Sequence, residues 1–162
     1  MITHLELTTS SVRGLLGEYA ATPFDPIFAR YGARFDIPLP LLQAIARHES
    51  RLDPTAKGEL NRNRTRDWGL MQVNDGQAAV MGYDVARLLE PEYNVSIAAE
   101  LLARIRGELG DAFGTLEWIA AYNAGSPAIK ARGVFNVSYV SSVLFHLAAY
   151  TMVEQYADAG GS

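Results

Sequence analysis

The 162-residue sequence contains no cysteine, and this absence removes several kinds of chemistry at once. Without thiols, the chain can have no disulfide, no zinc–thiolate site and no cysteine nucleophile. Histidine is also scarce, since only His4, His48 and His146 occur, so a histidine-rich metal site is not expected. We therefore predict neither a metal ion nor any other cofactor.

The sequence also lacks an excess of positive charge and a long apolar run. Its formal net charge is −4. Nucleic acid is therefore not an expected partner, because phosphate binding depends on a cationic surface. No apolar run reaches the roughly 18 residues that a membrane span needs, so no stable membrane insertion is expected. Residues 1–11 lack the basic-then-apolar layout of a signal peptide, and the export route is left open.

The residues that are present describe an ordinary folded domain, with 49% hydrophobic and 20% charged residues. We divide the chain into an N-terminal extension over residues 1–23, a main domain over residues 24–156 and a flexible tail over residues 157–162. A helix is predicted within the extension, over residues 12–20.

Helix punctuation is clear from Asp25 onward. Asp25 and Pro26 read as an N-cap followed by proline at the first helical position. Pro38 and Pro40 open a second helix that runs to about Glu49. Apolar spacing and turn residues predict further helices within residues 77–81, 85–89, 116–122, 126–133 and 139–151, and a long one beginning at Asn94 or Ser96. The fold is thus predicted to be mainly α, with a long loop or one small β-hairpin near residues 58–68.

Glu49 occupies an unusual position for a carboxylate. On a helical wheel of about 100° per residue it falls at about 80° from Leu41, inside the arc occupied by Leu42 and Ile45. Burial disfavours the charged carboxylate and raises its pKa, as a general acid requires. A solvent-exposed glutamate, or one paired with a neighbouring arginine, is the alternative that position alone leaves open.

Five short motifs, in order, resemble those of the soluble lytic transglycosylase family. Leu-Gln-Ala-Ile-Ala-Arg-His-Glu-Ser-Arg-Leu-Asp-Pro begins at Leu42, and Gly-Leu-Met-Gln-Val-Asn begins at Gly69. Leu-Glu-Pro-Glu-Tyr-Asn-Val begins at Leu89, Ala-Ala-Tyr-Asn-Ala-Gly begins at Ala120, and Tyr139-Val140 comes last. The resemblance spans about residues 24–150 and implies a lysozyme-like fold.

The resemblance also implies a reaction and a set of site residues. The reaction is cleavage of the β-1,4 bond between N-acetylmuramic acid (MurNAc) and N-acetylglucosamine (GlcNAc), with a 1,6-anhydro product and Glu49 as the single acid and base. The Tyr122 hydroxyl is expected to reach the Glu49 carboxyl, and Tyr139 is expected to line the cleft. The substrate-binding residues implied by the motifs are Ser50, Gln72, Asn74, Tyr122, Asn123 and Tyr139. Ser50 could equally make a hydrogen bond at the end of its helix.

The stretch from Pro54 to Gly69 is longer than in the common family pattern and rich in asparagine and arginine. In this it resembles phage-type and secretion-associated members, so we predict a small phage-encoded or secretion-associated enzyme. The absence of a signal peptide favours the phage alternative. Arg62, Arg64 and Arg66 are interpreted as a solvated or groove-edge face. A calcium loop is disfavoured, because Arg66 and Gln72 stand where such a loop requires glycine and glutamate.

The expected partner is therefore the glycan strand of peptidoglycan, cleaved at the cell wall by a monomer or by a component of a phage or secretion assembly. Two other functions stay open. One is a hydrolytic lysozyme, which would use a second carboxylate. The other is a non-catalytic glycan-binding or assembly module with the same fold.

Overall fold

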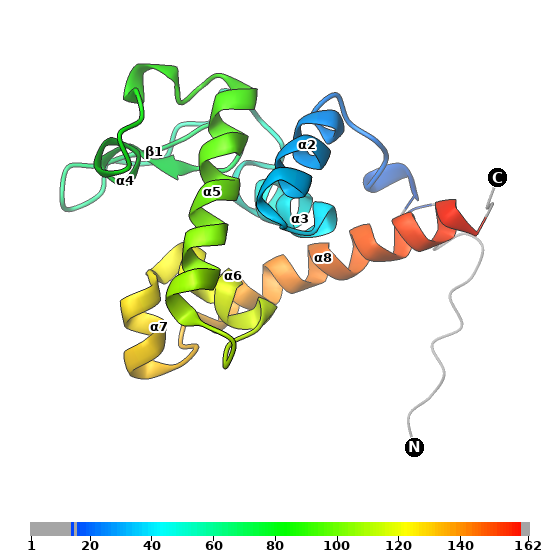
Figure 1. Ribbon diagram of the computed structural model, residues 1–162. Coiled ribbons are helices and arrows are strands. Elements are labelled where there is room, and N and C mark those ends of the chain that lie inside the picture. The colour runs from blue at the N-terminus through cyan, green and yellow to red at the C-terminus, as the bar shows by residue number, and fades with distance from the viewer. Residues whose placement is uncertain (1–13, 15, 160–162) are drawn as a thin grey trace.

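The computed structural model describes residue 14 and residues 16–159, and it is mainly helical with one small antiparallel sheet (Figure 1). The elements are α2 (Asp25–Phe35), α3 (Leu39–Ser50), β1 (Asp67–Trp68), β2 (Val73–Asn74), α4 (Asp75–Val80), the 3₁₀ helix η1 (Val85–Arg87), α5 (Pro91–Leu109), α6 (Thr115–Ala124), α7 (Ser126–Arg132) and α8 (Val137–Asp158). This confirms the prediction of a mainly α fold.

The N-terminal extension lies partly outside the described residues, so the helix predicted over residues 12–20 can be followed only at its end. Residues 16–18 are helical, and the helix stops before Tyr19. Tyr19 is 2% exposed. Its hydroxyl lies 2.8 Å from Nδ1 of His146, and its ring packs edge-on against Tyr150, so α8 holds this part of the extension.

The two helices that follow begin at their prolines. In α2 the N-cap is Phe24, so the prediction of Asp25 as the N-cap is wrong. Asp25 is instead the first helical residue, and its carboxylate accepts hydrogen bonds from the backbone N–H and the hydroxyl of Thr22. In α3 the helix continues through Glu49 to Ser50, as predicted, and ends where Arg51 adopts a left-handed backbone with φ 55°.

The small sheet lies slightly later in the chain than the predicted hairpin near residues 58–68. Asp67 pairs with Asn74 and Trp68 pairs with Val73, while Lys57 makes an isolated bridge to Trp68. The tight connection over residues 69–72 places Gly69 at φ +74°, where a Cβ atom would approach the Leu88 carbonyl oxygen to 2.7 Å. Only glycine therefore fits this turn.

The predicted start of the long helix α5, at Asn94 or Ser96, is wrong, because α5 begins at Pro91. Proline at the first helical position has a suitable φ and loses no hydrogen bond there. Asn94 is instead fully buried inside the helix. At the far end of the chain α8 extends to Asp158, two residues into the segment expected to be a flexible tail.

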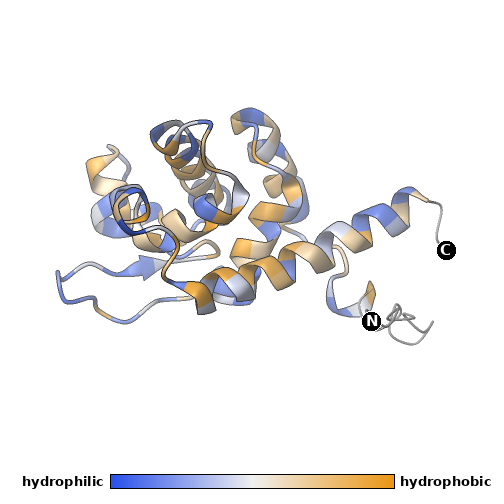
Figure 2. Ribbon diagram, turned by 90° about the horizontal axis from the view of Figure 1, so that it is seen from below, coloured by the Kyte–Doolittle hydropathy of each residue, from blue (hydrophilic) through white to orange (hydrophobic). Residues whose placement is uncertain are grey.

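Helix α5 runs through the middle of the molecule, with α4 and β1 on one side and α2 and α3 on the other, and α6 and α7 lie near its C-terminal end (Figure 1). The helices carry many apolar residues, whereas the segment before β1 is largely hydrophilic (Figure 2). The core joins side chains distant in sequence, such as Phe28, Leu42, Ile97, Ile119 and Val143, each fully buried. No helix of the described residues is long and apolar enough to cross a membrane.

Candidate active site

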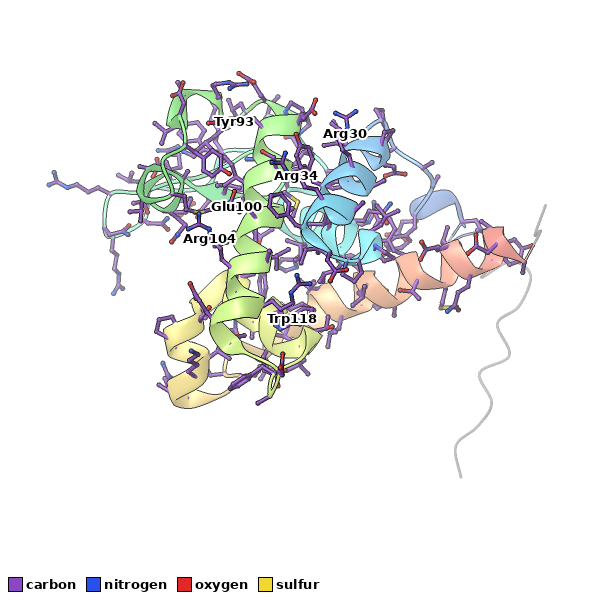
Figure 3. All side chains as sticks on the ribbon, viewed as in Figure 1. Arg30, Arg34, Tyr93, Glu100, Arg104 and Trp118 are labelled. Carbon is purple, nitrogen blue, oxygen red and sulfur yellow. The ribbon has the colours of Figure 1, made fainter. Side chains whose placement is uncertain are left out.

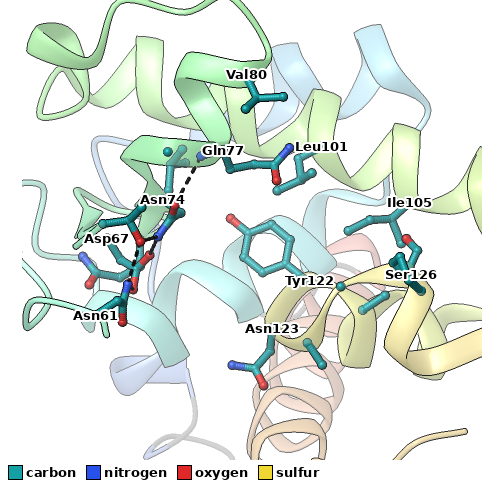
Figure 4. Close-up of a pocket in the computed structure, with 18 of the residues that line it drawn as sticks. Asn61, Asp67, Asn74, Gln77, Val80, Leu101, Ile105, Tyr122, Asn123 and Ser126 are labelled. Carbon is teal, nitrogen blue, oxygen red and sulfur yellow. Dashed lines mark hydrogen bonds between the residues drawn. The ribbon is translucent and has the colours of Figure 1, made fainter. Parts of the chain in front are cut away.

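A polar cleft of about 780 Å³ opens between α3, the segment before β1, α5 and the junction of α6 with α7 (Figure 4). Five of the residues predicted for the site line it: Glu49, Gln72, Asn74, Tyr122 and Asn123. Ser50 and Tyr139 lie outside the lining. We call Glu49, Tyr122, Tyr139 and the turn over residues 69–72 the cleft floor, and residues 57–68 the Arg-rich loop.

Glu49 lies in the last turn of α3 and is only partly exposed. The hydroxyl of Tyr139 donates a hydrogen bond to its Oε1 at 2.6 Å. The pKa of Glu49 is raised to about 7, mainly by burial; the Tyr139 hydrogen bond opposes the rise, and the negative charge of Asp67 adds to it. Glu49 therefore holds its proton up to near-neutral pH, as the helical wheel predicted.

Tyr139 is held in place by the contact between α3 and α8. The rings of His48 and Tyr139 meet edge to face, with centroids 4.7 Å apart. Nδ1 of His48 lies 2.8 Å from the hydroxyl of Ser142 on α8. Burial lowers the pKa of His48, so this ring supports Tyr139 as a neutral packing partner.

The two tyrosines have exchanged the roles expected of them. Tyr122 lines the cleft, and its hydroxyl donates to the backbone carbonyl of Met71 at 2.8 Å instead of to Glu49. Tyr139, expected to line the cleft, is the tyrosine that reaches the Glu49 carboxyl. The motif located both residues, but only the packing of α6 and α8 against α3 determines which hydroxyl meets the acid.

Ser50 and Gln72 fix the floor from below. The Ser50 hydroxyl contacts the carbonyls of Ala46 at 3.1 Å and Leu70 at 2.8 Å, so it ties the end of α3 to the turn. This is the structural alternative that the sequence left open for Ser50. Gln72 has φ +47°, and its side-chain amide donates to the carbonyls of Gly69 and Ala56 while the residue lines the cleft.

Asn74 and Asn123 lie on opposite walls. Asn74 caps α4 by accepting a hydrogen bond from the N–H of Gln77, and its amide donates to Thr65 and Asp67 at 2.8 Å each (Figure 4). Asn123 is exposed, and its side-chain oxygen accepts from the Asn136 amide. Both side chains are therefore positioned before any substrate arrives.

The sequence reasoning missed two residues that matter to the site. Asp67 lines the cleft, and its charge acts on Glu49. The available signal was its place after Asn61, Asn63 and Thr65, which also line the cleft. The second residue, Asn94, is 0% exposed. It accepts from the N–H of Met71 and donates to the carbonyls of Trp68 and Leu88, at 2.7–2.8 Å, which fixes the turn of the floor.

The arrangement has the parts that general-acid catalysis needs: a carboxylic acid that keeps its proton, fixed by a neutral donor and open to a polar cleft. Within the described part of the chain, no three histidine, aspartate or glutamate side chains lie together as a possible metal site.

Comparison with known proteins identifies the family. Residues 26–134 match the family described as Transglycosylase SLT domain, and the chain belongs to this family. Protein IpgF of Shigella flexneri is 36% identical over 105 residues, which make up 62% of this chain and 66% of that protein. The soluble lytic murein transglycosylase of Escherichia coli (strain K12) is 29% identical over 136 residues, 75% of this chain and 20% of that protein.

A solved structure resembles most of this chain. The crystal structure of the 70 kDa soluble lytic transglycosylase SLT70 from Escherichia coli matches 90% of this chain and 27% of that chain, with a TM-score of 0.63 and 25% identity. This likeness confirms the predicted lysozyme-like transglycosylase fold. The match to IpgF covers 66% of that protein's length.

Proposed function

We propose that the chain is a peptidoglycan lytic transglycosylase that cleaves the β-1,4 bond between MurNAc and GlcNAc. The observation that carries the proposal is the Glu49 carboxyl, raised in pKa to about 7 within the cleft. Membership of the transglycosylase SLT family and likeness to a protein named soluble lytic murein transglycosylase support the choice of reaction and substrate.

In the proposed reaction, Glu49 first acts as an acid. Tyr139 occupies Oε1 of Glu49, so Oε2 is the oxygen left to carry the transferred proton. This proton passes to the glycosidic oxygen as the bond to C1 of MurNAc breaks. The Glu49 carboxylate then removes the proton of the muramic C6 hydroxyl, and the oxygen of that hydroxyl bonds to C1. Glu49 regains its proton, no water is consumed, and the product ends in 1,6-anhydroMurNAc.

The pKa of Glu49 predicts the pH dependence. The acid must be protonated at the start of each cycle, so cleavage should fall as the pH rises through about 7. Gln72, Asn74, Tyr122 and Asn123 would contact the sugars, since they line the same cleft. The site of action would be the cell wall. A phage origin, a place in a secretion assembly and the oligomeric state stay predictions.

A hydrolytic lysozyme is the second candidate, and Asp67 is the observation that favours it. Asp67 shares the cleft with Glu49 and could activate a water molecule, as the second carboxylate of a hydrolase does. Mass spectrometry of digested peptidoglycan separates the two reactions. Anhydro ends support the transglycosylase, whereas purely reducing ends would exclude it.

Replacing Glu49 by Gln tests the role of the acid. Glutamine keeps an oxygen for the Tyr139 hydroxyl but has no acidic proton to give, so cleavage should fall by roughly 10²–10⁴-fold. Full activity of Glu49→Gln would refute the assignment. The parent protein tests the third candidate, a non-catalytic glycan-binding module. If the parent protein does not cleave peptidoglycan, that module is favoured.

The same variant reports on burial through its stability. The raised pKa means that Glu49 stabilises the fold fully below its ordinary value of 4.5, and this contribution is lost as the pH rises through about 7. Glu49→Gln should therefore raise the free energy of unfolding by about 1–3 kcal/mol at pH 8 and change it little at pH 4. Urea denaturation at both pH values measures this, and an unstable variant at pH 8 would contradict it.

A further inference from the structure

The Arg-rich loop concentrates positive charge in a chain that is acidic overall. Residues 57–68 contain four basic side chains, Lys57, Arg62, Arg64 and Arg66, and two acidic ones, Glu59 and Asp67, whereas the whole chain has a net charge of −4. This segment forms one lip of the cleft. A local cationic surface therefore lies beside the proposed glycan site.

The loop has two chemically different faces. Its inner face is neutral or acidic, because the residues that line the cleft are Asn61, Asn63, Thr65 and Asp67. The arginines that alternate with these residues are not among the lining residues. The Asn61 and Asp67 side chains lie beside Asn74, and the amides of Asn61 and Asn74 both donate hydrogen bonds to the Asp67 carboxylate (Figure 4). The basic residues therefore form a separate, outer face.

The basic residues of the outer face have no carboxylate partner among the described residues, since none of the ion pairs found there includes them. The charged ends of Lys57 and Arg66 lie 5.6 and 5.8 Å from the centre of the Trp68 ring. Trp68 is itself anchored, because its indole N–H donates to Asp75 at 3.1 Å. Two of the cations are thus placed on a fixed aromatic support.

The remaining two cations are at the tip. Arg62 and Arg64 are exposed, and the tip is closed by hydrogen bonds from the Asn61 N–H to the Thr65 carbonyl and from the Arg64 N–H to the Asn61 carbonyl. Arg64 has φ +66°, a backbone conformation that favours glycine. The loop therefore carries the long cationic side chain of Arg64 at a position where glycine would fit the backbone with less strain.

We infer that the outer face of the Arg-rich loop binds the carboxylates of the peptide stems carried by the glycan strand in the cleft. The inference rests on the proposed function. The stems branch from the lactyl groups of MurNAc and carry free carboxylates, so stems that leave the cleft over this lip meet Arg62 and Arg64. Arginine pairs well with carboxylates, and each exposed pair is weak, so several act together.

A binding measurement with Glu49→Gln protein tests the inference without cleavage. The probes are purified peptidoglycan sacculi, either native or with their stem carboxyls converted to amides by carbodiimide and ammonia. Co-sedimentation at low salt gives the dissociation constant for each. We expect Arg62→Gln/Arg64→Gln to weaken binding to native sacculi by about three- to tenfold, and binding to amidated sacculi to change little.

Arg30→Gln/Arg34→Gln is the charge control, because it removes the same charge from two exposed arginines, of which Arg30 pairs with Glu92. These residues lie on α2, on the other side of α5 from α4 and β1 (Figure 3). The control should bind native sacculi as the parent does. Equal losses in the two double variants would overturn the inference, and so would equal affinity of the parent for native and amidated sacculi.

A second readout separates this inference from the proposed function. In protein with Glu49 intact, Arg62→Gln/Arg64→Gln should raise KM for native peptidoglycan by a similar factor and leave kcat unchanged. Glycan strands freed of their stems by an amidase should be cleaved at the parental rate. If Arg62→Gln/Arg64→Gln also raised KM for stem-free strands, the loop would bind another anion, and the inference would be overturned.

Discussion

The cleft floor and the Arg-rich loop face the same space but are built in opposite ways. The floor is fixed by buried contacts between elements distant in sequence, such as the hydrogen bond from Tyr139 to Glu49 across 90 residues of chain. The loop is fixed mainly by its own turn, and its tip is exposed. The contacts that orient Glu49 therefore lie in the floor, and the exposed arginine charges lie on the lip.

The largest effect on stability should come from the residue that holds the turn of the floor. Asn94→Ala leaves the buried N–H of Met71 and the carbonyls of Trp68 and Leu88 without this partner. The free energy of unfolding should fall by about 2–4 kcal/mol in urea denaturation, with loss of cleavage. Asn63→Ala, at an exposed residue of the lip, should change the free energy of unfolding by less than about 1 kcal/mol. Similar losses in the two variants would contradict the proposed difference between floor and lip.

Tyr139→Phe should be next in size. It removes the hydrogen bond that orients Glu49 and that stabilises the carboxylate formed when Glu49 gives up its proton. The value of kcat should therefore fall by roughly tenfold to a hundredfold, as for a bond to a charged group. Because this bond lowers the pKa of Glu49, the alkaline limb of the pH profile should move to higher pH. The exposed Tyr156→Phe is the control. Because phenylalanine keeps the ring, an unchanged rate and an unshifted limb would give Tyr139 only a packing role.

Asp67→Asn should move the same limb in the opposite direction. The charge of Asp67 raises the pKa of Glu49, so its removal lets Glu49 ionise at lower pH. We expect a shift of up to about one pH unit in the kcat profile. Glu108→Gln removes one negative charge from the same cleft lining and should leave the limb in place. Complete loss of activity with Asp67→Asn, together with reducing ends in the products of the parent protein, would favour hydrolysis.

The smallest effect should come from the tip of the loop. Arg64→Gly relieves the left-handed backbone at φ +66°, while glycine gives the unfolded chain more freedom. The free energy of unfolding should stay within about 0.5 kcal/mol of the parent or rise slightly. Arg62→Gly, at a residue without positive φ, gains nothing in return and should be the less stable of the two. The reverse order in thermal melts would contradict this account of the tip.

Much of the fold was predictable because helices carry local signals. Prolines marked the starts of α2 and α3, and Ser126 with Gly133 bounded α7. The errors fell where a local signal was ambiguous: Asp25 is the first residue of its helix and not the cap, and α5 starts at Pro91. The strand pairing of β1 with β2 was misplaced because two-residue strands have no readable period.

By itself, the sequence determined that Glu49 points with the apolar side of its helix, because helical periodicity is a local property. The ordered motifs likewise located Gln72, Asn74, Tyr122 and Asn123, which line the cleft. Only the tertiary structure decided that Tyr139, and not Tyr122, meets the carboxyl, that Ser50 turns away to the Leu70 carbonyl, and that Asp67 acts on Glu49. These relations depend on how α3, α6 and α8 pack together, and no pattern within one segment encodes a distance to another.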